Sequence, residues 1–336
     1  MKEHGCKMKA EVLNFLTAAC RAGTFPGFTV SFLQDKQFST TLFGAETVLP
    51  NRKPLVADKW YDLASLTKAI VAVITLKVAE EGKLSLTAPL ASYCREASAK
   101  EITVGDLLTH TAGLTGFILD RNQLAGDVLK EKIFQLTPQW TPGTQMIYSD
   151  HHYLLLGFIL EEVTGKSLAK LLTEKINQPL GTAFTYAPVA SNCIPTSPLF
   201  DEKKNWVLNL QGIPHDPKAR QLGGVAGHAG IFGRLKDLQK LLQALLGDFL
   251  QPTSQKLAFT EQTAGFHRSF GFKLYKAPTD GRWLFSHTGY TGTFLLGDPV
   301  KKQGLIFLSN RVHPHDERQA YIEKRDQFIE LYLKDL

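Results

Sequence analysis

Apolar residues recur at helical spacing in the segment that follows Ser65. Ile70, Val73 and Leu76 fall on one side of a 3.6-residue repeat. Gly82 follows the last apolar positions, where glycine commonly ends a helix. The pattern predicts a largely buried helix that begins at Ser65.

Six shorter apolar runs, bounded by glycine, proline or polar turn residues, predict strands. They cover 28–33, 38–43, 270–275, 283–287, 293–296 and 305–309. Helical periodicity predicts further helices at 12–19, 103–110, 123–136, 151–163, 167–177, 235–246 and 316–333.

Strands therefore lie at both ends of the chain, with helices between them. Hairpin-length connections separate the C-terminal strands, which favours antiparallel pairing. We expect an α+β fold: a mostly antiparallel sheet flanked by the N- and C-terminal helices, with a large helical insertion. The chain is predicted to form one discontinuous unit, with 1–82 plus 251–336 as the sheet domain and 83–250 as the insertion.

Composition narrows the class of protein. The 336 residues are 43% hydrophobic and 21% charged, as in an ordinary globular protein. The 38 basic and 32 acidic residues give a diffuse net charge of +6, densest at Lys203-Lys204 and Lys301-Lys302. No basic stripe is interleaved with aromatic residues, so we expect no nucleic-acid partner. A small anionic substrate is compatible with this charge.

Targeting and cysteine spacing add two exclusions. The first six residues lack the apolar stretch of a secretion signal, and no segment is long enough to span a bilayer. We therefore expect a cytoplasmic protein. The four cysteines show neither Cys-x-x-Cys spacing nor the density of a disulfide framework. Nothing in the sequence indicates a cofactor, and it leaves the oligomeric state open.

Ser65 and Lys68 lie one turn apart at the start of the predicted buried helix. Side chains three residues apart share a face, with Cβ atoms roughly 5–6 Å apart, so the amine of Lys68 can reach the hydroxyl of Ser65. A serine becomes a nucleophile when a neighbouring base takes its proton. Lysine is such a base only when neutral, and we expect burial to lower the pKa of Lys68. The helix N-terminus also offers free N–H groups to a developing anion.

A second Ser-x-x-Lys, Ser167 to Lys170, shows how common this spacing is by chance. It opens a segment rich in charged residues. We interpret Ser167 as a helix-start serine followed by a surface lysine. The Ser65 motif therefore needs support from elsewhere in the chain.

Two further segments carry candidate chemistry. Tyr148-Ser149-Asp150 precedes a predicted helix, and a tyrosine hydroxyl beside a lysine can relay a proton. The alternative is a packed Tyr148 with Asp150 as helix cap. His287-Thr288-Gly289-Tyr290 ends a predicted strand, where His287 and Thr288 could contact a substrate carboxylate or the relay and the glycine would admit a substrate backbone. The alternative is a hairpin corner that needs glycine.

In this order the three segments resemble the penicillin-recognising serine hydrolases, the superfamily of class C β-lactamases, D-alanyl-D-alanine peptidases and related esterases and amidases. That family carries Ser-x-x-Lys, Tyr-x-Asn and Lys/His-Thr/Ser-Gly. The segments 62–65, 107–114 and 140–144 also look like family segments. The resemblance covers roughly 25–311.

The resemblance implies roles for these residues. Ser65 would be the acylated nucleophile and Lys68 its base, and Tyr148 would shuttle protons. His287 would stand where many relatives carry lysine. The backbone N–H groups of Ser65 and Tyr290 would form the oxyanion hole, while Asp150, Thr288 and Gly289 would contact the substrate. Asp150 replaces the usual asparagine, so an amide donor becomes an ionisable acceptor.

The segment 215–230 is dense in glycine and histidine and looks like a segment of a subgroup that includes cell-wall-recycling amidases. His228 either faces the cleft, where it would contact the substrate, or is an interior histidine bonded to the backbone. No metal site is expected. His151 and His152 point to different helix faces, and His313-Pro314-His315-Asp316 lacks the residues that would complete a zinc site.

The sequence thus predicts a metal-independent serine acyl hydrolase that works through an acyl-enzyme. The expected partner is a small acyl amide or ester, above all a peptidoglycan-derived peptide fragment. A small-ester esterase and a weak β-lactamase are the alternatives within the class. A penicillin-binding-like sensor without turnover is the alternative of another class.

Overall fold

The computed structural model of the protein describes residues 2–334 and 336. Its main sheet contains seven strands, which pair antiparallel in the order β3-β2-β1-β11-β10-β9-β8. Their bounds are β1 Gly27–Gln34, β2 Gln37–Thr47, β3 Lys53–Pro54, β8 Lys273–Lys276, β9 Trp283–Thr288, β10 Phe294–Asp298 and β11 Gln303–Ser309. The centre of the sheet therefore joins the two ends of the chain, with Val30 opposite Phe307. This confirms the predicted α+β fold with a mostly antiparallel sheet.

Five of the six predicted strands match in position, and the sixth begins later than expected. Residues 270 and 271 do not extend β8, because their N–H groups bond to the carbonyls of Leu257 and Leu108. Gly271 has φ +100°, and a Cβ there would lie 2.3 Å from the Cβ of Ala72. This segment passes over the buried helix before the strand starts at Lys273.

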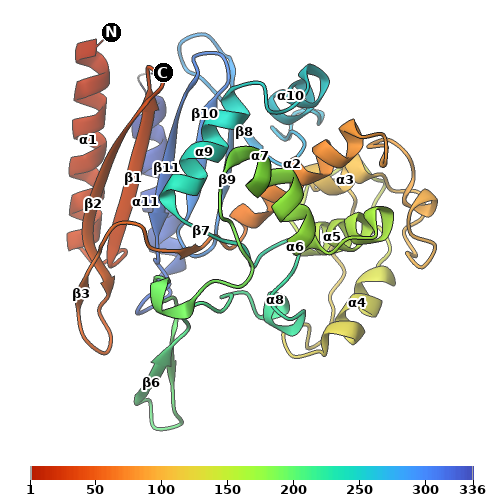
Figure 1. The fold of residues 1–336 in the computed structure, drawn as a ribbon, viewed down its shortest axis with the longest axis horizontal. Coiled ribbons are helices and arrows are strands. Elements are labelled where there is room, and N and C mark those ends of the chain that lie inside the picture. The colour runs from red at the N-terminus through yellow and green to blue at the C-terminus, as the bar shows by residue number, and fades with distance from the viewer. Residues whose placement is uncertain (1, 335) are drawn as a thin grey trace.

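Helices cover both faces of the sheet (Figure 1). The N-terminal helix α1 (Lys2–Arg21) and the C-terminal helix α11 (Arg318–Leu333) pack on one face, and α9 (Leu235–Leu246) and α10 (Pro252–Phe259) contact the other. The alternation along β11 follows from this arrangement. Leu305 and Phe307 belong to the hydrophobic core under α1 and α11, while Ile306 and Leu308 belong to the core that includes α9 and α10.

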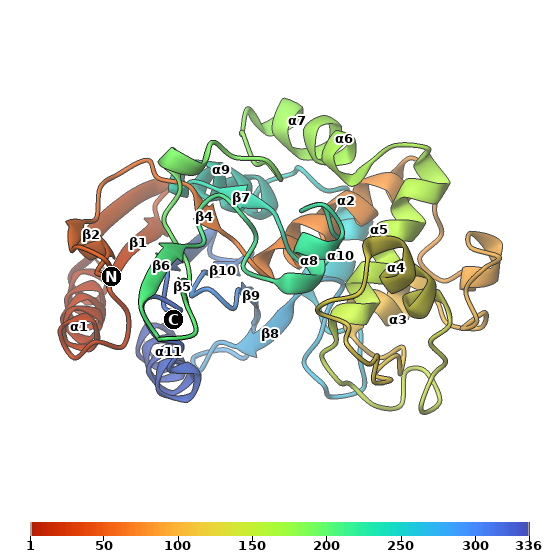
Figure 2. The ribbon, with the colours of Figure 1, turned by 90° about the horizontal axis from the view of Figure 1, so that it is seen from below.

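The remaining helices surround α2 (Leu66–Glu80) on the side away from α1 (Figure 2). They are α3 Val104–Thr109, α4 Gly126–Phe134, α5 Asp150–Thr164, α6 Leu168–Leu172, α7 Gln178–Leu180 and α8 Pro217–Gln221. Two small sheets join them: β4 (Tyr61–Asp62) with β7 (Phe232–Gly233), and β5 (Pro198–Phe200) with β6 (Trp206–Asn209). The division into a sheet domain and a helical insertion stays a prediction.

The helix predicted after Ser65 is confirmed as α2. Twelve of its fifteen residues are buried, so its apolar residues face neighbours all round. Ser65 occupies the N-cap position. Ser167 likewise caps α6, where its hydroxyl accepts the Lys170 N–H at 3.3 Å; this agrees with its interpretation as a helix-start serine.

Within the described part of the chain, no helix combines the length and apolarity needed to cross a bilayer. Cys20, Cys94 and Cys193 are buried free thiols. The side chain of Cys6 and residues 1 and 335 lie outside the description.

Candidate active site

Ser65 sits on a sharp turn between β4 and α2. The preceding residue, Ala64, has φ 45°, a left-handed conformation that a non-glycine residue adopts only when its surroundings hold it. The buried carboxylate of Asp62 supplies that hold. It accepts the N–H of Ala64 at 2.8 Å and the N–H of His215 at 2.6 Å, and burial raises the pKa of Asp62 to about 6.

Two threonines of the β9–β10 connection fix the same turn from the other side. Thr291 donates its hydroxyl to the carbonyl of Asp62 at 2.7 Å, and Thr293 donates to that of Leu63 at 2.9 Å. Gly289 packs against them, because a Cβ there would lie 2.0 Å from Thr293 Oγ1 and 2.3 Å from the Leu63 carbonyl oxygen. Contacts within the protein therefore already require glycine at position 289, whether or not a substrate approaches it.

Lys68 is the most completely enclosed charge of the site, with a fully buried side chain. Its Nζ lies 2.9 Å from Ser65 Oγ, 2.9 Å from Asp150 Oδ1 and 3.0 Å from the carbonyl oxygen of His228. An ammonium has three N–H donors, and these three acceptors use all of them. A neutral amine would leave one acceptor facing a lone pair.

The charge state of Lys68 differs from the expectation. Burial alone would lower the pKa of Lys68, but the charge of Asp150, the nearby Tyr148 and the bond to Asp150 outweigh burial, and the net shift raises the pKa. The prediction that burial lowers this pKa is wrong. The reason is the aspartate that stands in place of asparagine, since it gives the buried ammonium a counter-ion.

Tyr148 stands over this pair at the rim of the cleft, with 41% of its surface exposed. Lys68 Nζ lies 5.1 Å from the centre of its ring, and the guanidinium of Arg268 lies 5.7 Å from it. The centre of the His110 ring lies 4.4 Å from that of Tyr148, and His110 Nδ1 accepts the Ser149 N–H at 3.3 Å. His110 thus supports the loop that carries the phenol.

His287 reaches the same cleft from the end of β9. Its ring centre lies 6.3 Å from that of Tyr148, and Nδ1 lies 3.0 Å from the carbonyl oxygen of Thr288. Because that oxygen can only accept, Nδ1 carries the proton. Burial and the charges of Lys68 and Arg268 lower the pKa of His287 to about 3. The ring is therefore neutral at physiological pH and supplies no positive charge where many relatives have lysine.

One cleft of about 210 Å³ collects the three predicted segments: its wall includes Ser65, Tyr148, His287, Thr288, Gly289 and Tyr290. The positive charge of this cleft was not predicted from the sequence. The described residues of its wall also include five cations and no carboxylate: Arg268, Lys273, Arg311, Arg318 and Arg325. Arg318 and Arg325 both lie on α11, but Arg268, Lys273 and Arg311 come from other segments, so no single spacing in the sequence joins the five.

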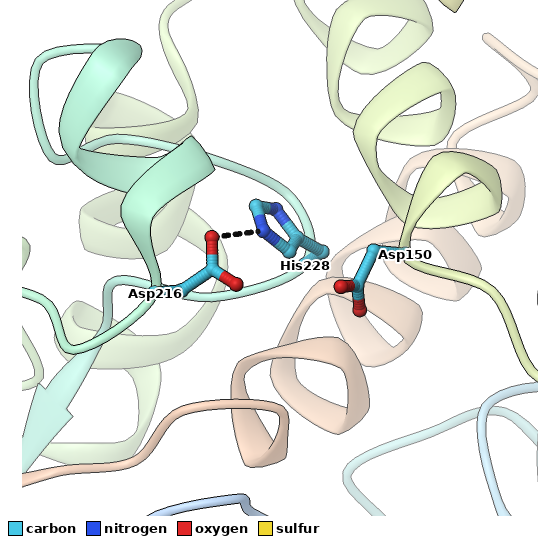
Figure 3. A group of neighbouring side chains, drawn as sticks. All are labelled: Asp150, Asp216 and His228. Carbon is cyan, nitrogen blue, oxygen red and sulfur yellow. Dashed lines mark hydrogen bonds and ion pairs between the residues drawn. The ribbon is translucent and has the colours of Figure 1, made fainter. Parts of the chain in front are cut away.

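Neither Asp150 nor His228 lines this cleft: Asp150, with 30% of its side chain exposed, lines a neighbouring pocket with Tyr148 and Lys218, and His228 is buried. Figure 3 shows them with Asp216, which comes from the start of α8. Ligand atoms of Asp150, Asp216 and His228 lie within 4.8 Å of one another, a spacing that a metal ion could use. The ammonium of Lys218, however, already bridges the two carboxylates, at 3.0 Å from Asp216 and 3.3 Å from Asp150. A cation would have to displace it, so this donor set suits lysine rather than a metal.

Two of the other histidines weighed for metal binding, His313 and His152, have structural partners. His313 Nε2 accepts the N–H of Val48 and of Leu49, and its Nδ1 lies 3.1 Å from the Thr196 carbonyl oxygen. His152 faces His110, with 3.0 Å between their Nδ1 atoms. These rings hold loops together within the described structure.

The chain is similar in sequence and in fold to known proteins. The family model described as Beta-lactamase matches residues 15–328. A putative D-alanyl-D-alanine carboxypeptidase of Escherichia coli is 30% identical over 300 residues, which cover 75% of this chain and 69% of that protein. One of Salmonella typhimurium is 28% identical over 321 residues, covering 81% and 74%.

Solved structures show the same fold at low identity. The beta-lactamase/D-alanine carboxypeptidase of Pseudomonas syringae has a TM-score of 0.77 at 17% identity, covering 98% of this chain and 99% of that one. The D-amino acid amidase of Ochrobactrum anthropi has a TM-score of 0.77 at 18% identity, covering 98% of each chain.

Proposed function

Because the chain belongs to the beta-lactamase family and is a hydrolase, we propose that it cleaves an amide or ester bond through an acyl-enzyme on Ser65. One observation carries this proposal: the Ser65 hydroxyl accepts a hydrogen bond from a buried ammonium, in a cleft that Tyr148 and the 287–290 segment share. Few structural roles would require that arrangement, because a buried lysine costs stability unless it is fully paired.

The reaction follows from the donors and acceptors present. Ser65 Oγ attacks the acyl carbon and loses its proton. Lys68 uses its three N–H groups as donors, so in the proposed step the proton passes to Tyr148, which reacts as the phenolate beside the Lys68 ammonium and becomes the neutral phenol. The tetrahedral intermediate then expels the amine or alcohol, which takes the proton back. Water repeats the sequence on the acyl-serine and releases the acid.

Two backbone N–H groups are available for the oxyanion. Among the described residues, neither Ser65 nor Tyr290 donates its N–H to another backbone group. Both residues line the cleft, and Ser65 adds the N-terminus of α2. Such a donor contributes about 3 kcal/mol to stabilisation of the transition state.

The charge of the cleft supports an anionic substrate. Arg268 lies over Tyr148 and beside His287, and no carboxylate pairs with it among the described residues. Since His287 is neutral, Arg268 supplies the positive charge at this end of the site. A peptide fragment derived from peptidoglycan carries a free carboxylate that such a guanidinium would bind. The name of the curated relatives, D-alanyl-D-alanine carboxypeptidase, supports the same class of substrate.

Hydrolysis assays test the proposal. Cell-wall muropeptides and a neutral chromogenic ester are incubated with the wild type and with Ser65→Ala. We expect turnover by the wild type and its loss in the variant. Stoichiometric binding without turnover would contradict the proposal and favour a sensor. Turnover of esters or β-lactams alone would instead identify an esterase or a β-lactamase on the same machinery.

A further inference from the structure

The contacts of Lys68 continue into a closed ring of polar and charged side chains, which one backbone carbonyl completes. Asp150 accepts from Lys68 at 2.9 Å through Oδ1 and meets Lys218 at 3.3 Å through Oδ2. Lys218 Nζ lies 3.0 Å from Asp216 Oδ2, and Asp216 Oδ1 lies 2.8 Å from His228 Nε2. The carbonyl oxygen of His228 accepts from Lys68 at 3.0 Å, which closes the ring.

We propose that Lys218, Asp216 and His228 are positioning residues of the active site, which act through Asp150 and the His228 carbonyl to hold the Lys68 ammonium against Ser65. This inference rests on the proposed function and deepens it. It adds three residues that the three sequence motifs do not contain. None of the three touches Ser65.

Charge balance explains why the ring holds together. Two lysines face two aspartates, and each carboxylate oxygen has a cation or N–H partner, with Lys218 shared between the two aspartates. Lys68, His228 and Lys218 have exposed side-chain fractions of 0%, 1% and 9%. At such burial an unpaired charge is far costlier than at the surface. Loss of one member therefore changes the proton affinity of its neighbours.

Two short segments position these residues: the start of α8 and the glycine-rich segment that follows it. Asp216 caps α8, where its Oδ1 also accepts the Ala219 N–H at 2.9 Å, so Lys218 lies in the first turn. The glycine-rich segment then returns to α5. A Cβ at Gly227 would lie 2.1 Å from the Tyr153 carbonyl oxygen. Only glycine allows this approach, and it places the next residue, His228, over Lys68. Gly227, one of the glycines of the 215–230 segment, thus serves this contact.

Lys218 balances the negative charge of the ring. Its ammonium contacts both aspartates and so helps to keep them ionised. Removing a cation raises the pKa of any base in the site, and removing an anion lowers it. The other titratable groups coupled to Lys68 are Tyr148, His110, His152 and His287. His151 faces Asp150 and Lys218, and Asp62 faces Asp216. None of these groups lies on α8.

Opposite charge changes at the two positions test the inference. The pH profile of kcat/KM is measured on a neutral chromogenic ester, so that the cationic cleft contributes little. The acid limb reports protonation of the base that accepts the Ser65 proton. In Lys218→Met this limb should move to higher pH, and in Asp216→Asn to lower pH, each by about one pH unit. Lys218→Arg keeps the positive charge and should keep the wild-type profile. Lys166→Met, which breaks the Lys166–Glu174 pair outside the ring, should leave the profile unchanged.

A purely structural role would not move the two limbs in opposite directions. Superimposable profiles, or shifts of the same sign, would overturn the inference. A second measurement needs no turnover: in a double-mutant cycle of urea unfolding, Asp150→Asn with Lys218→Met should lose less stability than the sum of the single losses. Additive losses would show that Asp150 and Lys218 are not energetically coupled and would contradict the inference at this contact. If the wild type is inactive but the cycle shows coupling, the proposed function is refuted and the inferred ring is supported. If the wild type is active but the pH profiles are unchanged in the variants, the proposed function is supported and the inferred positioning role is refuted.

Discussion

Replacing Asp150 with asparagine tests the most unusual feature of the site, the buried ion pair on Lys68. The substitution keeps the shape of the side chain and removes its charge. Breaking a buried ion pair by removing one partner costs about 3–5 kcal/mol. The amide oxygen can still accept from the ammonium, and such a bond recovers about 2 kcal/mol. We therefore expect Asp150→Asn to lower the free energy of unfolding at pH 7 by about 2 kcal/mol.

The pH dependence of that loss identifies its origin. Burial would raise the pKa of Asp150, but Lys68, His228 and Lys218 hold this pKa well below its usual value of 3.8. Its contribution is therefore present above pH 3.8 and is lost as the pH falls through the folded value. Lys68 behaves in the opposite sense: its pKa is raised, so its contribution is full below the ordinary value of 10.5 and is lost as the pH rises through the folded value. Between these limits the difference should be constant.

Urea denaturation of both proteins from pH 2.5 to 9, where these pKa shifts set the window, measures this difference. Asp58→Asn is a matched control, because Asp58 pairs with Lys236 at 2.7 Å but both side chains are about half exposed. That variant should lose less than about 1 kcal/mol. The reasoning fails if Asp150→Asn is as stable as the wild type at pH 7. It also fails if the loss stays the same at pH 2.5.

Three further substitutions probe the cleft and its supports. Arg268→Met should raise KM for a carboxylate-bearing substrate about tenfold while leaving a neutral ester unaffected; equal effects on both would contradict its role in binding the anion. His287→Gln should preserve the shape of the kcat/KM profile between pH 5 and 9, because the pKa of His287 is lowered to about 3; a limb that disappears with the ring would contradict this. Gly227→Ala should destabilise the fold by about 1–3 kcal/mol through the clash with Tyr153, measured by urea unfolding, and a neutral effect would show that the loop can move.

The parts of the fold that could be predicted depend on local patterns. Helix α2 followed from the apolar spacing after Ser65, and helical geometry alone placed Lys68 beside the hydroxyl. The strand pairs near the C-terminus followed from their short connections. The start of β8 could not be predicted, because the bonds of residues 270 and 271 run to the carbonyls of Leu257 and Leu108 in other parts of the fold.

The properties that decide the chemistry depend on contacts across the chain. Lys68 was expected to be neutral because burial was visible in the sequence and its partner was not. Asp150 was noted as a departure from the family pattern, yet its pairing with Lys68 required coordinates. Lys218 and Arg268 gave no signal, since a lysine in a short helix and an arginine in a loop have no characteristic spacing.

The central claim, that acyl transfer passes through Ser65, is tested most directly by trapping the acyl group. The protein is mixed with a chromogenic ester, quenched during turnover, digested and analysed by mass spectrometry. The account predicts a mass gain equal to the acyl group on the peptide that contains Ser65, and no gain and no turnover in Ser65→Ala. Acylation at another residue, or hydrolysis that persists in Ser65→Ala, would contradict it.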